Sequence, residues 1–99
     1  MMTVAIPVEE GNAAYRDGSL GKLVGQFIND HKPEAAYFST NEDGERAGIM
    51  ILDLKEPSDM IRLAEPWFLD LNARVTFKPV MNAQDLAKEM SSERVGSRN

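Results

Sequence analysis

The sequence lacks cysteine altogether and has one histidine and one tryptophan in 99 residues. Without cysteine the chain cannot form a disulfide framework, a thiolate metal site or a cysteine nucleophile. A single histidine cannot build a histidine-cluster metal site within one chain. No phosphate-binding loop, dinucleotide fingerprint or zinc-protease motif is present. We therefore expect neither a metal nor a cofactor.

Basic residues are also scarce, with 11 Lys and Arg against 16 Asp and Glu, for a net charge of −5. A nucleic-acid binder needs a basic face to neutralise phosphates, so this balance argues against that class. The apolar runs are only a few residues long, far short of a membrane span. No secretory signal is visible, which together with the absence of cysteine predicts a cytoplasmic protein.

The length of the chain predicts one domain over residues 1–90. The last nine residues, SSERVGSRN, are small and polar, and predict a mobile tail over 91–99. A chain this short buries only roughly 65% of its unfolded surface, so its stability is often shared with a partner subunit.

Hydrophobic periodicity predicts an α+β protein. Apolar alternation indicates strands over 2–8, 34–40, 45–54 and 72–80. Helical spacing indicates helices over 19–31, from a start at 55–59 through the following apolar stripe, and from 82 to about 90, with a short helical turn over 12–17. The order is β-α-β-β-α-β with an extra C-terminal helix, which is the ferredoxin-like arrangement with a four-stranded antiparallel sheet.

Local signals support these boundaries. Ser19 and Asn82 can each cap a helix, and the Asn-Glu-Asp-Gly sequence ending at Gly44 predicts a hairpin turn. Gly21 and Gly25 lie on one side of their helix and predict a close approach to a strand.

The third and fourth strands have different side chains on their two faces. The third strand is apolar on both faces, with Ile49 and Ile51 on one and Met50 and Leu52 on the other. The fourth strand has Ala73, Val75 and Phe77 on one face and Arg74, Thr76 and Lys78 on the other. A strand that is apolar on both faces must be covered on both, which helices on one side cannot do. This pattern predicts a sheet-to-sheet dimer interface on the remaining face.

A proline lies beside the only tryptophan inside a helical stripe. Because helical spacing continues through Pro66, the pattern predicts a kinked or restarted helix and not a loop. Trp67 and Phe68 are then core residues lying on the sheet. The alternative is that Trp67 lines a ligand pocket.

Most polar residues have a structural interpretation. His31 is expected to cap a helix C-terminus. Glu45 is expected to be a solvated turn residue, and Asp59 and Arg62 an exposed ion pair. Asp53 shares a face with Ile49 and is expected to be partly buried, in a cap or turn role.

The candidate ligand-binding residues are Tyr37, Arg74 and Lys78. Arg74 and Lys78 form a short basic row on an acidic protein, and Tyr37 joins them if the strand registers agree. A small anionic ligand would bind there; the alternative is a salt bridge between subunits. No catalytic residue is assigned.

The segments KPEAAYFSTNEDGERAGIMILDL and RLAEPWFLDLNARVTFKPVMNAQDL, within about Val4 to Leu86, resemble small, uncharacterised bacterial proteins of the ferredoxin-like dimeric α+β barrel superfamily. Ala-Glu-Pro-Trp-Phe followed by Pro-Val-Met is the most specific part of the resemblance. It implies a homodimer in which two sheets close face to face with the helices outside.

Two functional hypotheses follow. The first is a homodimeric protein with a binding or structural role and no chemistry. The second is a cofactor-independent enzyme, of the monooxygenase or isomerase type, acting on a small organic molecule in the barrel. The partner in both is a second copy of the chain, and a small-molecule ligand is possible; neither hypothesis involves nucleic acid or a membrane.

Overall fold

The computed structural model describes residues 1–92, with the side chains of residues 1–91. Its elements, in chain order, are β1 (Met2–Ile6), α1 (Val8–Asp17), α2 (Ser19–His31), β2 (Ala35–Thr40), β3 (Arg46–Ile51), α3 (Asp59–Leu71), β4 (Arg74–Phe77) and α4 (Ala83–Ser92). The predicted α+β class is confirmed. Residues 93–99, most of the predicted tail, lie outside the described residues.

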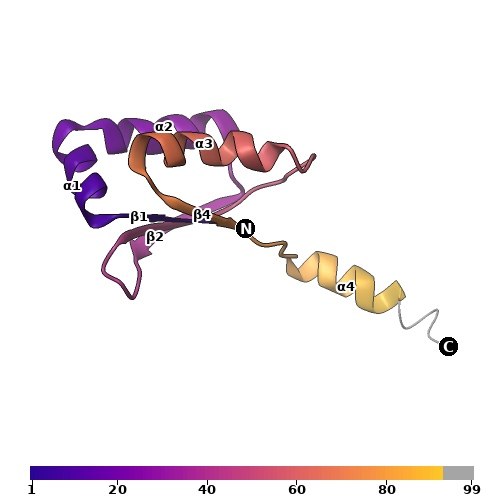
Figure 1. Ribbon diagram of the computed structural model, residues 1–99. Helices are drawn as coiled ribbons and strands as arrows, with labels where there is room; N and C mark the ends of the chain where they lie inside the picture. Colours follow the sequence, from indigo (N-terminus) through magenta and orange to yellow (C-terminus); the bar gives the residue numbers. More distant parts are fainter. Residues whose placement is uncertain (93–99) are drawn as a thin grey trace.

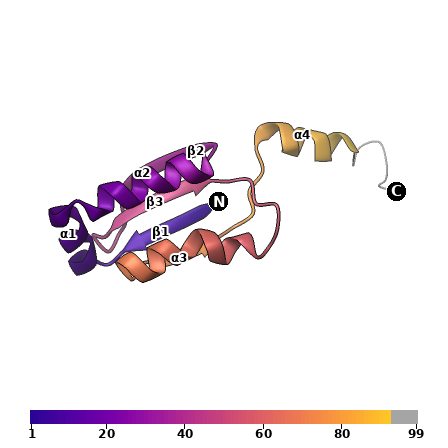
Figure 2. The same ribbon diagram turned by 90° about the horizontal axis from the view of Figure 1, so that it is seen from above.

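The four strands form one antiparallel sheet in the order β2-β3-β1-β4. Helices α2 and α3 lie on the same side of this sheet, and α1 connects β1 to α2 at one end (Figure 1). Seen from above, α2 lies on the β2–β3 side and α3 on the other side of β1 (Figure 2). This arrangement is compatible with a ferredoxin-like fold.

Strand register explains which side chains the helices cover. Met2 pairs with Met50 on one side and with Phe77 on the other, and Val4 pairs with Val75. These residues share one face because side chains alternate along each strand. The core combines that face with the inner sides of the helices: Met2, Val4, Ile6, Ala14, Phe27, Met50, Leu63, Trp67, Leu71 and Ala73. The predicted apolar face of the fourth strand is therefore confirmed.

The other face of the sheet, which we call the open face, carries the alternate residues of each strand: Thr3, Ala5, Ala35, Tyr37, Ser39, Ala47, Ile49, Ile51, Arg74 and Thr76. Within residues 1–92 no helix covers it (Figure 1). Ile49 is 40% exposed as a result.

Several predicted boundaries were wrong. The first strand ends at Ile6, and Pro7 is followed by a ten-residue helix that begins at Val8, not by a short turn at residue 12. Glu9 and Glu10 favour that earlier start, because carboxylates stabilise the positive end of a helix dipole. The helix α4 extends to Ser92, two residues beyond the predicted end.

The capping predictions had mixed outcomes. Asn82 caps α4, since its Oδ1 accepts a hydrogen bond from the Asp85 backbone N–H at 2.7 Å. Ser19 does not cap α2; Gly18 does, at a φ of 84°, and the Ser19 N–H donates to the Asp17 carboxylate. The turn prediction is confirmed, with Gly44 at a φ of 77°.

Helix α3 continues through Pro66, as predicted. Trp67 is buried, with 2% of its surface exposed, but Phe68 is 39% exposed. The prediction that both are core residues was therefore wrong for Phe68. Neighbouring helical residues point about 100° apart, so a narrow stripe buries only one of them.

Candidate functional site

A groove of about 510 Å³ lies on the helix side of the sheet, between α2 and the β2–β3 hairpin. We call it the α2 groove. Its lining residues come from six elements and from the α1–α2 junction: Val4, Ile6, Tyr15, Gly18, Leu20, Gly21, Val24, Phe38, Ser39, Arg46, Ala47, Gly48 and Trp67. Most of these are apolar. The groove therefore has the size and the chemistry of a small-molecule site.

Glycines shape both walls of the α2 groove. On the strand side, the Phe38 ring packs over Gly48, where a Cβ would lie 3.1 Å from two ring carbons. On the helix side, a Cβ at Gly21 would meet nothing within 4 Å. The same is true of Gly25, so the predicted close approach of a strand to these glycines was wrong. At Gly21 the missing side chain leaves space that belongs to the groove.

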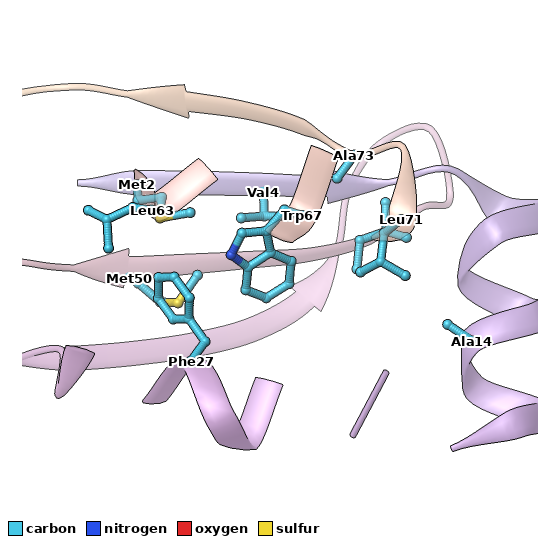
Figure 3. Packing of buried hydrophobic residues seen from close by; sticks show 10 residues of the cluster. Met2, Val4, Ala14, Phe27, Met50, Leu63, Trp67, Leu71 and Ala73 are labelled. Atoms are coloured by element: carbon cyan, nitrogen blue, oxygen red, sulfur yellow. The ribbon is translucent and has the colours of Figure 1, made fainter. Parts of the chain in front are cut away.

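Trp67 forms part of the groove and also belongs to the core. Its ring packs edge-on against Phe27, with centroids 5.4 Å apart and an interplanar angle of 67°. Figure 3 shows it among Phe27, Met50, Val4 and Leu71. Its Nε1 is buried and has no hydrogen-bond acceptor within residues 1–92. The two interpretations of Trp67, as core residue and as wall of a pocket, are thus compatible.

Arg46 and Tyr15 bring polar groups to the α2 groove. The Arg46 Nη1 donates a hydrogen bond to Asn12 Oδ1 at 3.0 Å. Its guanidinium carbon lies 5.5 Å from the centre of the Tyr15 ring, within the range of a cation–π contact. A guanidinium has five N–H donors, so this contact set leaves donors for an anion. The groove therefore combines a hydrocarbon wall with a fixed positive charge.

Sequence reasoning missed this site. Arg46 and Tyr15 are 31 positions apart in the chain (46 − 15), and only the folded structure brings them together. Two residues carried a signal. The alternative interpretation of Trp67 placed it in a ligand pocket, and Phe38 lies on the opposite side of its edge strand from Tyr37.

The three predicted ligand-binding residues do not converge. Tyr37 and Arg74 lie on the open face, but on the edge strands β2 and β4, with β3 and β1 between them. Three strand spacings separate such positions by about 14 Å. Lys78 follows β4 and lines a different cavity.

Arg74 is paired within its own chain. Its Nη2 donates to Glu45 Oε1 at 2.5 Å, and its Nη1 lies 3.4 Å from Oε2. The side chain of Glu45 is only 12% exposed, so the prediction of a solvated turn residue was wrong. Hydrogen bonds from the Asn41 amide and from Arg74 lower the pKa of the Glu45 carboxyl below its ordinary value.

Asp59 and Arg62 form the predicted ion pair on α3. Burial alone would raise the pKa of the Asp59 carboxyl, but hydrogen bonds from Arg62 and from the Glu56 backbone outweigh it, and the net shift is downward. The Asp17 carboxyl also has a lowered pKa, because it accepts hydrogen bonds from Ser19. All three carboxyls are weaker bases than ordinary ones.

A second cavity, of about 690 Å³, lies at the end of the sheet where the chain leads into α4. We call it the sheet-end hollow. It is lined by Met1, Met2, Glu34, Ile51, Leu52, Asp53, Leu54, Met60, Phe77, Lys78, Pro79, Val80, Met81, Asn82 and Asp85.

The prediction that Asp53 is partly buried was wrong. Its side chain is 87% exposed and pairs with Lys55 at 3.7 Å, because β3 ends two residues earlier.

His31, which was predicted to cap the C-terminus of a helix, makes contacts of a structural kind. His31 ends α2, and its ring packs 4.6 Å from that of Phe27. No three His, Cys, Asp or Glu side chains gather into a possible metal site within the described part of the chain. None of the helices through residue 92 is long and apolar enough to cross a membrane.

Comparisons with known proteins identify no relative. No family model, no curated protein and no solved structure matches this chain.

Proposed function

We propose that this protein is a homodimeric, ferredoxin-like α+β barrel protein that binds a small apolar carboxylic acid in the α2 groove without catalysing a reaction. The observation that carries the proposal is the groove itself: an apolar wall that includes Trp67, with Arg46 as its cation. An alkyl or aromatic body would occupy the apolar part, and a carboxylate would bind the guanidinium.

Binding is a better proposal than catalysis because of where the acid and base groups lie. The side chains of the α2 groove are mainly hydrocarbon, with the Tyr15 phenol and one guanidinium, which is a permanent cation; the Ser39 side chain lies on the open face. The carboxyls with shifted pKa values, those of Asp17, Glu45 and Asp59, do not line it, and their lowered pKa values weaken them as bases.

The ligand proposal is tested by titrating the protein with octanoate and following tryptophan fluorescence. Trp67 is the only tryptophan, so the whole signal comes from the groove wall. Octanoate should shift the emission and saturate, and octanol should bind more weakly because it lacks the charge that Arg46 pairs. Absence of a saturable change at millimolar octanoate would overturn the proposal.

Two glycines of α2 provide a matched pair of variants. Gly21 lines the α2 groove and Gly25 does not, and a Cβ at either site meets nothing within 4 Å. Both changes favour the helix by roughly 0.8 kcal/mol, so both proteins should fold. Gly21→Leu should abolish octanoate binding and Gly25→Leu should retain it; equal affinities would contradict the proposed site.

The dimer is proposed from the open face. Among its ten strand positions Arg74 alone carries a charge, and Glu45 of the same chain already pairs with it. In a chain with 27% charged residues, an uncharged and uncovered sheet face is typical of an interface. A second copy fits because the same face on both chains can meet about a two-fold axis, as in sheet-to-sheet packing.

Light scattering coupled to gel filtration tests this contact at tens of micromolar protein. The wild type should have twice the 11.0 kDa mass of one chain. Ile49→Lys should give a monomer, because it places a charge at the centre of the open face. Ile61→Lys, on α3 and 62% exposed, is the matched control and should remain dimeric. A monomeric wild type, or a dimeric Ile49→Lys protein, would refute the sheet-to-sheet dimer.

A further inference from the structure

Helix α4 extends away from the rest of the chain (Figures 1 and 2). The structure measures 58 × 28 × 18 Å and has a radius of gyration of 16.8 Å. A compact domain of this length would have a radius of gyration of about 13 Å. The segment from Pro79 to Ser92 therefore forms an arm, and we use that name for it below.

The arm has an apolar stripe that the rest of residues 1–92 leaves exposed. Leu86 and Met90 are four residues apart on one side of α4 and are 45% and 53% exposed. Val80 and Met81, which precede the helix, are 49% and 62% exposed. An isolated helix shorter than about 12 residues is marginal in water, and α4 has ten. Its stability thus requires a surface that covers the stripe.

The sheet-end hollow has the complementary properties. Its walls include the apolar side chains of Leu52, Met60 and Phe77, and it is open at the base of the arm. Asn82, which caps α4, and Asp85, in its first turn, already line the hollow of their own chain, and the helix runs outward from there. The apolar stripe farther along the arm therefore lies beyond the reach of its own hollow in this conformation.

We propose that two copies of the chain exchange arms, so that Leu86 and Met90 of each copy pack into the sheet-end hollow of the other. A two-fold arrangement covers both stripes and both hollows at once. The charged side chains at the wall of the hollow are Lys78 and the carboxylates of Glu34, Asp53 and Asp85, so the exchange rests on apolar burial and not on charge. Ile51 belongs both to the hollow and to the open face, so the exchange continues the proposed dimer interface.

This inference rests on the proposed dimer and adds that each hollow is complete only with residues of the second copy. The absence of cysteine makes a direct test possible. Met60→Cys, at the hollow, and Met90→Cys, on the arm, are prepared as separate single variants, one of them carrying a mass tag. The two are mixed, oxidised mildly and separated by mass without reductant.

The same mixing is done with Ile61→Cys in place of Met60→Cys. The disulfide between Met60→Cys and Met90→Cys should form in large excess over the one between Ile61→Cys and Met90→Cys, because docking raises the effective concentration of only the first pair. Ile61 is the matched control because it follows Met60 on α3, is exposed and does not line the hollow. Equal yields would overturn the inference, as would a product dominated by Met90→Cys joined to itself. In a third protein that carries both Met60→Cys and Met90→Cys, an intrachain disulfide would overturn the exchange by showing that the arm folds back on its own chain.

The outcomes also separate this inference from the proposed function. If the wild type is a dimer and Ile49→Lys is a monomer, but no mixed disulfide forms, only the arm exchange fails. A monomeric wild type removes the dimer and the arm exchange together, and leaves octanoate binding in the α2 groove to its own test.

Discussion

The contribution of Trp67 to stability can be derived from its surroundings. The side chain is 2% exposed and packs against Phe27 in the centre of the core (Figure 3). Truncation of a buried tryptophan to alanine costs about 3–5 kcal/mol, from lost burial and from the cavity that remains. Domains of this size have about 5–15 kcal/mol of total stability, so Trp67→Ala should lose a large fraction of it.

Phe68→Ala is the matched control, because it truncates an aromatic residue one position farther along the same helix. Phe68 is 39% exposed, and we expect its truncation to cost no more than about 1 kcal/mol. Urea denaturation followed by circular dichroism at 222 nm measures both variants without relying on tryptophan emission.

Trp67→Phe examines the unpaired indole nitrogen. An unsatisfied buried N–H carries a penalty of about 1–3 kcal/mol, which phenylalanine removes. Trp67→Phe should therefore cost much less than Trp67→Ala, and clearly less than the loss of ring size alone would imply. If Trp67→Ala lost less than about 1 kcal/mol, or no more than Phe68→Ala, the assignment of Trp67 as the principal core residue would be wrong.

Three further predictions concern charge and backbone. The Glu45 carboxyl has a lowered pKa in the folded protein, so its ionised form stabilises the fold. This contribution to the free energy of unfolding is fully present above about pH 4.3, the ordinary glutamate value, and is lost as the pH falls through the lowered pKa. Urea midpoints measured from pH 6 to pH 3 should therefore fall more steeply for the wild type than for Glu45→Gln, and parallel curves would contradict this. Gly18 has a φ of 84° with nothing within 4 Å of a Cβ, so Gly18→Ala should lower stability by about 1 kcal/mol through the backbone alone; an unchanged melting temperature would refute it. Lys32 has a φ of 44° at the end of α2, so Lys32→Gly should raise the melting temperature slightly, and a lower value would show that the lysine side chain contributes more than the backbone strain costs.

The core face of the sheet could be predicted because the two-residue alternation of side chains along each strand determines it. Alternation along a strand places Val75 and Phe77 on the same side whatever lies above them, and the structure confirms that side as the core face. The passage of α3 through Pro66 was predictable for the same reason, because apolar spacing continued on both sides of the proline.

The ligand groove could not be predicted, because it depends on distances between elements. The sequence pattern places Gly21 on α2 but does not say which residues of other elements line a groove with it. The pairing of Arg74 with Glu45 could not be predicted from the sequence either. It joins residues 29 positions apart through the register of β1 with β3 and with β4, which periodicity alone does not determine.

Pro66 has a consequence for the motions of α3. Because proline has no N–H, the carbonyl of Arg62 receives no helical hydrogen bond from position 66, and the ladder of bonds along α3 is interrupted there. The turns that carry Met60 can thus open without breaking the turn that holds Trp67 and Leu71 in the core. In hydrogen exchange, amides of the first turn, around Met60, should exchange by local opening, and those of the last turn only by global unfolding. The wall of the sheet-end hollow formed by Met60 can then adjust its width on a faster timescale than the core rearranges.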